Sequence, residues 1–167
     1  LATVAWYRRD FGRAIAMYSD VLSARSRLLG ARHRDTLKAQ FDLSSSYQLS
    51  GDLVRAEKLL RDVLEQQRQA FGSEDPDTLS SLNNLQGLYY LSKRYADALP
   101  VATEVFERRR RSLASDHPDL FTAQHNLAAI LFQLRREEEA EALVGGALEG
   151  RRRVIGRRHS GTLRTWE

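Results

Sequence analysis

Histidine is the side chain in this sequence best suited to catalysis or metal binding, because the chain contains no cysteine. Three of its four histidines, His33, His117 and His159, are separated by 84 and 42 residues, and Asp75 takes the same position in between. Helices pack about 8–10 Å apart, whereas zinc requires ligands at about 2 Å, so residues repeated at that interval do not converge on one ion. We therefore interpret these histidines as loop or helix-capping residues, and expect no metal site.

Two other features resemble reactive sites. His125 stands outside the histidine series, but its own predicted helix offers no obvious carboxylate or nucleophile as a partner. The segment 145–151, GGALEGR, resembles a phosphate-binding loop, yet Arg151 replaces the required lysine and the segment falls inside a predicted helix with no strand before it. We expect neither a cofactor nor enzymatic activity.

Arginine runs at 108–111 and 151–153 are the strongest charge features. One interpretation is a nucleic-acid surface. The other is a solvated helix end, because both runs close predicted helices, where cations interact favourably with the helix dipole. The net charge of +4 is moderate and charges of opposite sign are interspersed, so we favour the solvated helix end.

The chain repeats itself every 42 residues. An alanine recurs at one position in four units: Ala14, Ala56, Ala98 and Ala140. A glycine marks the joint between helices in three of them: Gly30, Gly72 and Gly156. Such a period is typical of helical solenoids, in which each unit buries its apolar face against its neighbours.

Local patterns divide each unit into two helices. Asp75 before Pro76 is a typical helix start, and Leu82, Leu85 and Tyr89 form an apolar stripe at helical spacing. The predicted helices are 35–50, 53–71, 76–92, 95–113, 118–134 and 137–154. The repeat units are expected at about 11–50, 53–92, 95–134 and 137–167, with a partial helix at 1–9.

These elements predict an all-α fold, a right-handed superhelical solenoid of antiparallel helix pairs. The first helix of each pair is expected to line its concave side. The sequence begins and ends inside predicted helices, so we expect a piece of a longer array. No apolar run approaches the roughly 20 residues that span a bilayer, and the absence of cysteine favours a cytoplasmic protein.

The segment 75–98, DPDTLSSLNNLQGLYYLSKRYADA, resembles the 42-residue tetratricopeptide repeat of kinesin light chains and of related bacterial and fungal proteins. His125 to Ala129, HNLAA, and Arg34 to Leu37, RDTL, repeat the theme less closely. The resemblance covers essentially the whole chain. It implies recognition of a protein or peptide in the concave groove, and the same repeats serve adaptors and sensors alike.

Residues opposite the apolar stripe are expected to face the groove. In the three complete first helices they are Lys38, Phe41, Asp42, Ser45, Gln48, Ser80, Asn83, Asn84, Gly87, Tyr90, Thr122, His125, Asn126, Ala129 and Phe132. An amide both donates and accepts hydrogen bonds, so it can hold the backbone of an extended peptide. Asn84 and Asn126 are thus the foremost candidate contacts, although bonds within the array are an alternative role for them.

Aromatic residues share one position of that face: Trp6, Tyr90 and Phe132. They are candidates for apolar anchoring pockets or for core residues, whereas Tyr47 and Tyr89 are expected in the core. Repeats that clamp a terminal carboxylate carry Asn with Lys or Arg on this face. Here Ser45 and Gly87 stand where such residues would follow, which disfavours a carboxylate clamp.

The sequence therefore predicts a protein- or peptide-binding scaffold or sensor within a larger regulatory or signalling protein. Of 26 basic residues only three are lysines, which is typical of a high-GC genome and favours a bacterial source. The alternative is a sensor for a small ligand or nucleic acid that regulates an attached nucleotide-binding or DNA-binding domain. The oligomeric state and the partner are not predicted.

Overall fold

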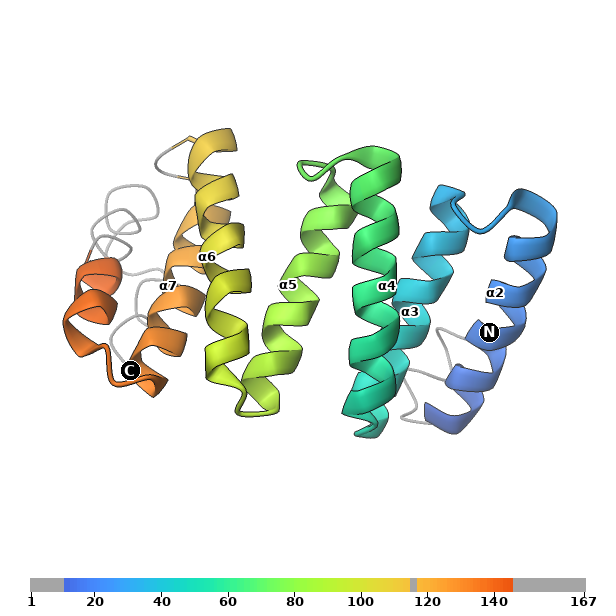
Figure 1. Cartoon of the computed structure of the whole chain (residues 1–167), viewed down its shortest axis with the longest axis horizontal. Coiled ribbons are helices and arrows are strands. Elements are labelled where there is room, and N and C mark those ends of the chain that lie inside the picture. Colours follow the sequence, from blue (N-terminus) through green and yellow to red (C-terminus); the bar gives the residue numbers. More distant parts are fainter. Residues whose placement is uncertain (1–10, 115–116, 146–167) are drawn as a thin grey trace. The chain divides into compact units, whose positions relative to one another are not determined.

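The computed structural model describes residues 11–114 and 117–145, and this part of the chain is helical with no strand (Figure 1). The helices are α2 (Phe11–Leu29), α3 (Arg34–Ser50), α4 (Leu53–Phe71), α5 (Pro76–Leu91), α6 (Tyr95–Ser112) and α7 (Pro118–Gln133), followed by a helical segment at 137–145. The predicted bounds of α3 to α7 differ from these by at most one residue at either end. The all-α prediction is confirmed, while the predicted partial helix at 1–9 lies outside the described residues.

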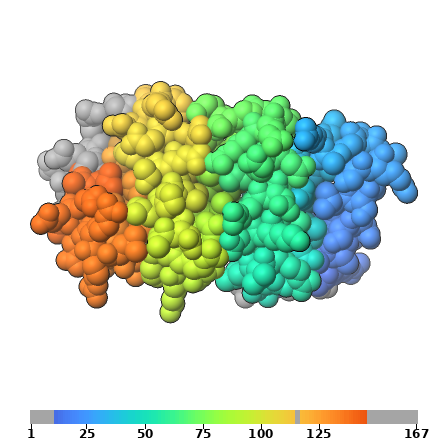
Figure 2. Space-filling view, in the orientation of Figure 1, coloured from blue at the N-terminus to red at the C-terminus, as the bar shows by residue number. Residues whose placement is uncertain are grey.

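The contacts divide the chain into two compact units, with the boundary between Leu88 and Tyr89. In the first unit α2 packs against α3 and α3 against α4. In the second unit α6 packs against α7. In Figure 1 α3 lies behind α4, and the side chains of α4 cover most of it in the space-filling view of Figure 2. The first helices α3 and α7 therefore each have a side packed against a second helix.

The alanine that recurs every 42 residues is buried in all four repeats: Ala14, Ala56, Ala98 and Ala140. A methyl group at this position lets neighbouring helices approach closely, toward the short end of the usual 8–10 Å. Larger apolar side chains fill the space around it, among them Leu37 and Leu60 in the first unit and Val105 and Phe121 in the second. The 42-residue pattern thus corresponds to the core.

The turn after each first helix uses a left-handed backbone at one repeat position. The residues there are Gly51, Lys93 and Arg135, with φ of 87°, 57° and 60°. A residue with a Cβ costs about 1–2 kcal/mol in this conformation, so glycine is the expected choice. Two of the three turns carry a long basic side chain instead, which explains why glycine alone does not reveal this joint in the sequence.

None of the helices in the described part of the chain is long and apolar enough to cross a membrane.

Candidate functional site

The three helices that carry the predicted binding residues begin in the same way. Nδ1 of His33 accepts a hydrogen bond from the backbone N–H two residues later at 3.2 Å, and Nδ1 of His117 does so at 3.1 Å. Oδ1 of Asp75 makes the equivalent bond at 2.9 Å. Each bond satisfies a backbone donor that the helix leaves open. The predicted capping role is confirmed for His33 and His117, whereas His159 lies outside the described residues.

None of the predicted binding residues in α3, α5 and α7 is buried. The exposed ones are Lys38, Ser80, Tyr90, Thr122, His125 and Phe132. The half-buried ones are Phe41, Asp42, Ser45, Gln48, Asn83, Asn84, Gly87, Asn126 and Ala129. Leu82, Leu85 and Tyr89 on the opposite stripe are buried, so the predicted inward and outward sides of α5 are correct. We call this set of residues the first-helix face; Trp6 lies outside the described residues.

One polar position of the first-helix face recurs in all three helices, as Asp42, Asn84 and Asn126. Nδ2 of Asn84 donates to Oγ of Ser45 at 3.4 Å, which connects α5 to α3 within the first unit. This is a long and therefore weak hydrogen bond, and it uses only one of the two amide donors. Asn84 thus bonds within the array, as the alternative interpretation held, and keeps a second donor and a carbonyl for other contacts.

Asp42 takes the place of the amide in α3. Burial raises the pKa of its carboxyl group, and the positive charges of Lys38 and Arg25 act in the opposite direction. A half-buried carboxylate is a poorly hydrated acceptor. This position of the face therefore accepts hydrogen bonds in α3 and both donates and accepts them in α5 and α7.

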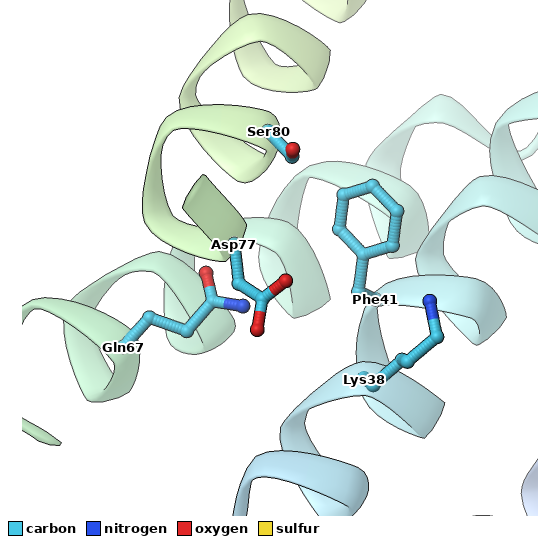
Figure 3. A pocket seen from close by; sticks show the side chains of 5 residues that line it. All are labelled: Lys38, Phe41, Gln67, Asp77 and Ser80. Carbon is cyan, nitrogen blue, oxygen red and sulfur yellow. The ribbon is translucent and has the colours of Figure 1, made fainter. Parts of the chain in front are cut away.

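A hollow of about 100 Å³ opens in the first unit between three helices (Figure 3). Its lining residues are Lys38 and Phe41 from α3, Gln67 from α4, and Asp77 and Ser80 from α5. We call this hollow the Gln67 pocket. The sequence identified Lys38, Phe41 and Ser80, but it missed Gln67 and Asp77. The signal for Gln67 was its departure from the repeat, because the equivalent residues 25 and 109 are both arginine.

Arg34 holds one wall of the Gln67 pocket. Its Nη2 lies 2.7 Å from Oδ2 of Asp75, its Nη1 pairs with Asp77, and its guanidinium lies 4.2 Å from the centre of the Phe71 ring. The hydrogen bonds from Arg34 hold the pKa of Asp75 below its ordinary value. One guanidinium therefore connects the first turn of α3 to the cap and first turn of α5, and fixes the Asp77 carboxylate beside the pocket.

The tetratricopeptide repeat family model matches residues 1–65, 43–111 and 87–145. Together these matches cover most of the chain. The chain belongs to the tetratricopeptide repeat family. The family model thus agrees with the repetition seen in the alanines and in the helix caps.

Solved structures with the same fold include other tetratricopeptide repeat proteins. A kinesin light chain from Podosopora anserina with nearly identical TPR-like repeats is 24% identical with a TM-score of 0.89, covering 99% of this chain and 78% of that chain. BtubC (BKLC) from P. vanneervenii is 26% identical with a TM-score of 0.73, covering 93% of this chain and 63% of that chain. The apo form of RapI is 17% identical with a TM-score of 0.82, covering 98% and 44%. The predicted tetratricopeptide repeat fold is confirmed, and it is similar to the fold of these kinesin light chain repeats.

A search of curated proteins by sequence finds no match.

The arginine run of this tetratricopeptide repeat chain forms contacts within the second unit. Arg108 pairs with Glu104 and Arg110 with Glu107, each at 2.8 Å. Nη1 of Arg109 donates to the backbone carbonyl of Asp119 at 3.0 Å. These contacts support the interpretation of the run as a helix end and not as a nucleic-acid surface. The second run and most of the GGALEGR segment lie outside the described residues.

No group of three or more metal-ligating side chains occurs within residues 11–114 and 117–145.

Proposed function

We propose that this tetratricopeptide repeat chain binds a protein or peptide segment along its first-helix face. Tetratricopeptide repeats generally act as protein–protein interaction scaffolds, and the proposal assigns that role to particular residues of this chain. The observation that carries it is the amide or carboxylate repeated at Asp42, Asn84 and Asn126, half-buried and on the outward side of each first helix. A segment laid across α3 and α5 meets such a polar group at both helices, and α7 carries it again in the second unit.

Amides suit the backbone of an extended segment. The side chain of Asn126 offers two donors and one carbonyl, which match the alternating N–H and C=O groups of a peptide. Half-burial restricts the side chain before binding, so less conformational entropy is lost when the partner arrives. Such contacts hold a backbone without selecting its sequence.

Two exposed rings supply the apolar part of the recognition. Phe132 is 55% exposed and Tyr90 is 37% exposed, and they occupy equivalent positions in α7 and α5. Aromatic residues are enriched among the anchors of protein interfaces. The Tyr90 ring packs against Tyr95 with an edge-to-face geometry at 5.4 Å, which limits its motion.

In the wider protein, this role is that of a scaffold or sensor in a bacterial regulatory or signalling protein of the cytoplasm. The arginine-rich, cysteine-free composition is the basis for that setting. A longer chain would carry further repeats or an attached domain that responds to the bound segment.

The test is a variant that removes both amides, Asn84→Ala with Asn126→Ala. A partner is first captured with the unaltered chain and identified, and its dissociation constant is then measured by calorimetry. Each hydrogen bond contributes about 0.5–1.5 kcal/mol, so the loss of two is expected to weaken binding by about 5- to 150-fold.

The matched control replaces polar residues of second helices, Gln66→Ala with Thr103→Ala, and is expected to leave affinity unchanged. Melting temperatures of both variants are measured, because the lost bond from Asn84 to Ser45 is weak and the expected change is small. Undiminished binding by the Asn variant would contradict the proposal. Capture of nucleic acid, with binding that falls steeply as salt is added, would instead favour the alternative sensor role.

A further inference from the structure

Gln67 stands at a repeat position that arginine occupies in the repeats before and after it. The equivalent residues are Arg25 and Arg109. Nη1 of Arg25 donates to the backbone carbonyl of Asp35 at 2.8 Å, and Nη1 of Arg109 donates to that of Asp119 at 3.0 Å. In these two repeats a guanidinium therefore connects the last turns of a second helix to the first turn of the first helix that follows it.

In the repeat that carries Gln67, the corresponding carbonyl belongs to Asp77, which lies 42 residues after Asp35. Gln67 is too short to reach as an arginine does, and it carries no charge. The Gln67 pocket is bordered by both Gln67 and Asp77, so it occupies the region that the guanidinium spans in the other two cases. The substitution leaves a space and removes a donor at the same place.

One buried polar atom beside the pocket has no hydrogen-bond donor. Gln67 is only 2% exposed, and its Oε1 is buried with no hydrogen-bond partner. An unsatisfied buried acceptor costs about 1–3 kcal/mol, so a ligand that donates to it gains that energy back. In Figure 3 the nitrogen of the Gln67 amide lies on the side of the Asp77 carboxylate, and its oxygen is turned away from that carboxylate. Oε1 of Gln67 is thus the acceptor that a donating ligand would satisfy.

We propose that the Gln67 pocket is a binding site for the guanidinium group of an arginine carried by the partner segment. The inference rests on the proposed function, because Lys38, Phe41 and Ser80 of the pocket belong to the first-helix face and the partner brings the arginine. The pocket acts as a specificity site beside the amides, which bind the backbone.

The size of the pocket agrees with this ligand. An engineered cavity of about 150 Å³ holds benzene, which has six heavy atoms. A hollow of about 100 Å³ therefore suits a group of about four heavy atoms, and a guanidinium has one carbon and three nitrogens. Phe41 supplies an aromatic wall, on which the planar cation can stack.

The charges around the pocket permit a cation to enter. Arg34 already pairs with Asp75 and Asp77, and the charge of Lys38 acts on Asp42 against the rise in pKa that burial causes there. In Figure 3 the ammonium of Lys38 lies on the other side of Phe41 from the Gln67 amide and the Asp77 carboxylate. Arg34 therefore neutralises the Asp77 carboxylate of the pocket, and Oε1 of Gln67 remains as the acceptor without a partner.

The direct test is a titration of the ¹⁵N-labelled chain, followed by NMR, with Nα-acetylarginine methylamide as the probe. The lysine and citrulline derivatives are the controls, since lysine keeps the charge without the planar fork and citrulline keeps the shape without the charge. The arginine probe is expected to shift the side-chain amide of Gln67 and the backbone amides of Asp77 and Ser80. A dissociation constant in the millimolar range is expected for so small a contact.

Two variants make the test specific. Gln67→Arg introduces the residue that Arg25 and Arg109 represent in the other repeats, so that the guanidinium of the variant itself fills the pocket. This variant is expected to abolish the probe shifts and to raise the melting temperature by about 2–6 °C. Gln67→Leu removes the acceptor with little change in size, and it is expected to abolish the probe shifts as well. Unchanged shifts in either variant overturn the inference, as do equal shifts with the lysine probe.

The partner provides the last arm of the test. Its affinity is expected to fall about tenfold in Gln67→Arg. Loss of partner binding in the Asn84 and Asn126 double variant, without any effect of Gln67→Arg, would overturn the inference and leave the proposed function intact. If the unaltered chain binds the arginine probe but Gln67→Arg leaves the partner's affinity unchanged, the pocket takes a small molecule and not the partner's arginine. That result would also overturn the inference.

Discussion

Replacing Phe121 by alanine is expected to lower the free energy of unfolding by about 3–5 kcal/mol. Phe121 is 2% exposed and is one of the largest side chains in the core. Removing its ring takes away apolar contacts and leaves a cavity in the second unit, where α6 packs against α7. The free energy is measured by urea denaturation followed by circular dichroism.

Phe132→Ala in the same helix is the matched control. Its ring is 55% exposed, so the expected change is within about 0.5 kcal/mol. Because stability in repeat arrays is local, hydrogen exchange should place the effect of Phe121→Ala in α6 and α7. Equal destabilisation by both variants would mean that the register assigned to α7 is wrong.

Replacing Pro100 by alanine is expected to raise the free energy of unfolding by about 1–3 kcal/mol. Pro100 is the sixth residue of α6, beyond the first turn, so its missing N–H leaves the carbonyl of Ala96 without its helical bond. The ring is exposed, so no core packing is lost when it is removed. Thermal and urea denaturation both report the gain.

The position equivalent to Pro100 in α4 is Lys58, which provides the control. Lys58→Ala is expected to change stability by less than about 0.5 kcal/mol, because lysine and alanine are both good helix formers. No gain from Pro100→Ala would show that α6 accommodates the proline by a distortion that alanine does not relieve.

The helices and their outward faces could be predicted because their determinants are local. A 42-residue repeat aligns weak signals in one unit with strong ones in another, and Pro76 and Pro118 mark helix starts directly. The inward stripe of α5 follows from helical spacing alone. Even the capping role of His33 could be inferred, since its repeat position always precedes a first helix.

Contacts between helices of successive repeats could not be predicted from such signals. The Arg34 fork to Asp75 and Asp77 and the bond from Asn84 to Ser45 depend on distances that the packing sets. The Gln67 pocket was missed for the same reason, because a second helix was not expected to reach the first-helix face.

Tyr47 is a further correction. It was expected in the core, like Tyr89, but it is only half-buried. The guanidinium of Arg55 lies 4.8 Å from its ring centre and covers it, so part of the ring is packed under a charged side chain at the surface. Sequence spacing places a residue on a side of its helix, but not at a depth.

Photo-crosslinking from two matched positions tests the central claim most directly. Thr122 of α7 and Thr103 of α6 are both exposed, and the hydroxyl of each donates to the carbonyl four residues earlier. With a photoreactive amino acid at each position in turn, the captured partner is expected to crosslink from residue 122 and not from residue 103. Crosslinks from residue 103 alone would place the partner on the second helices and contradict the account.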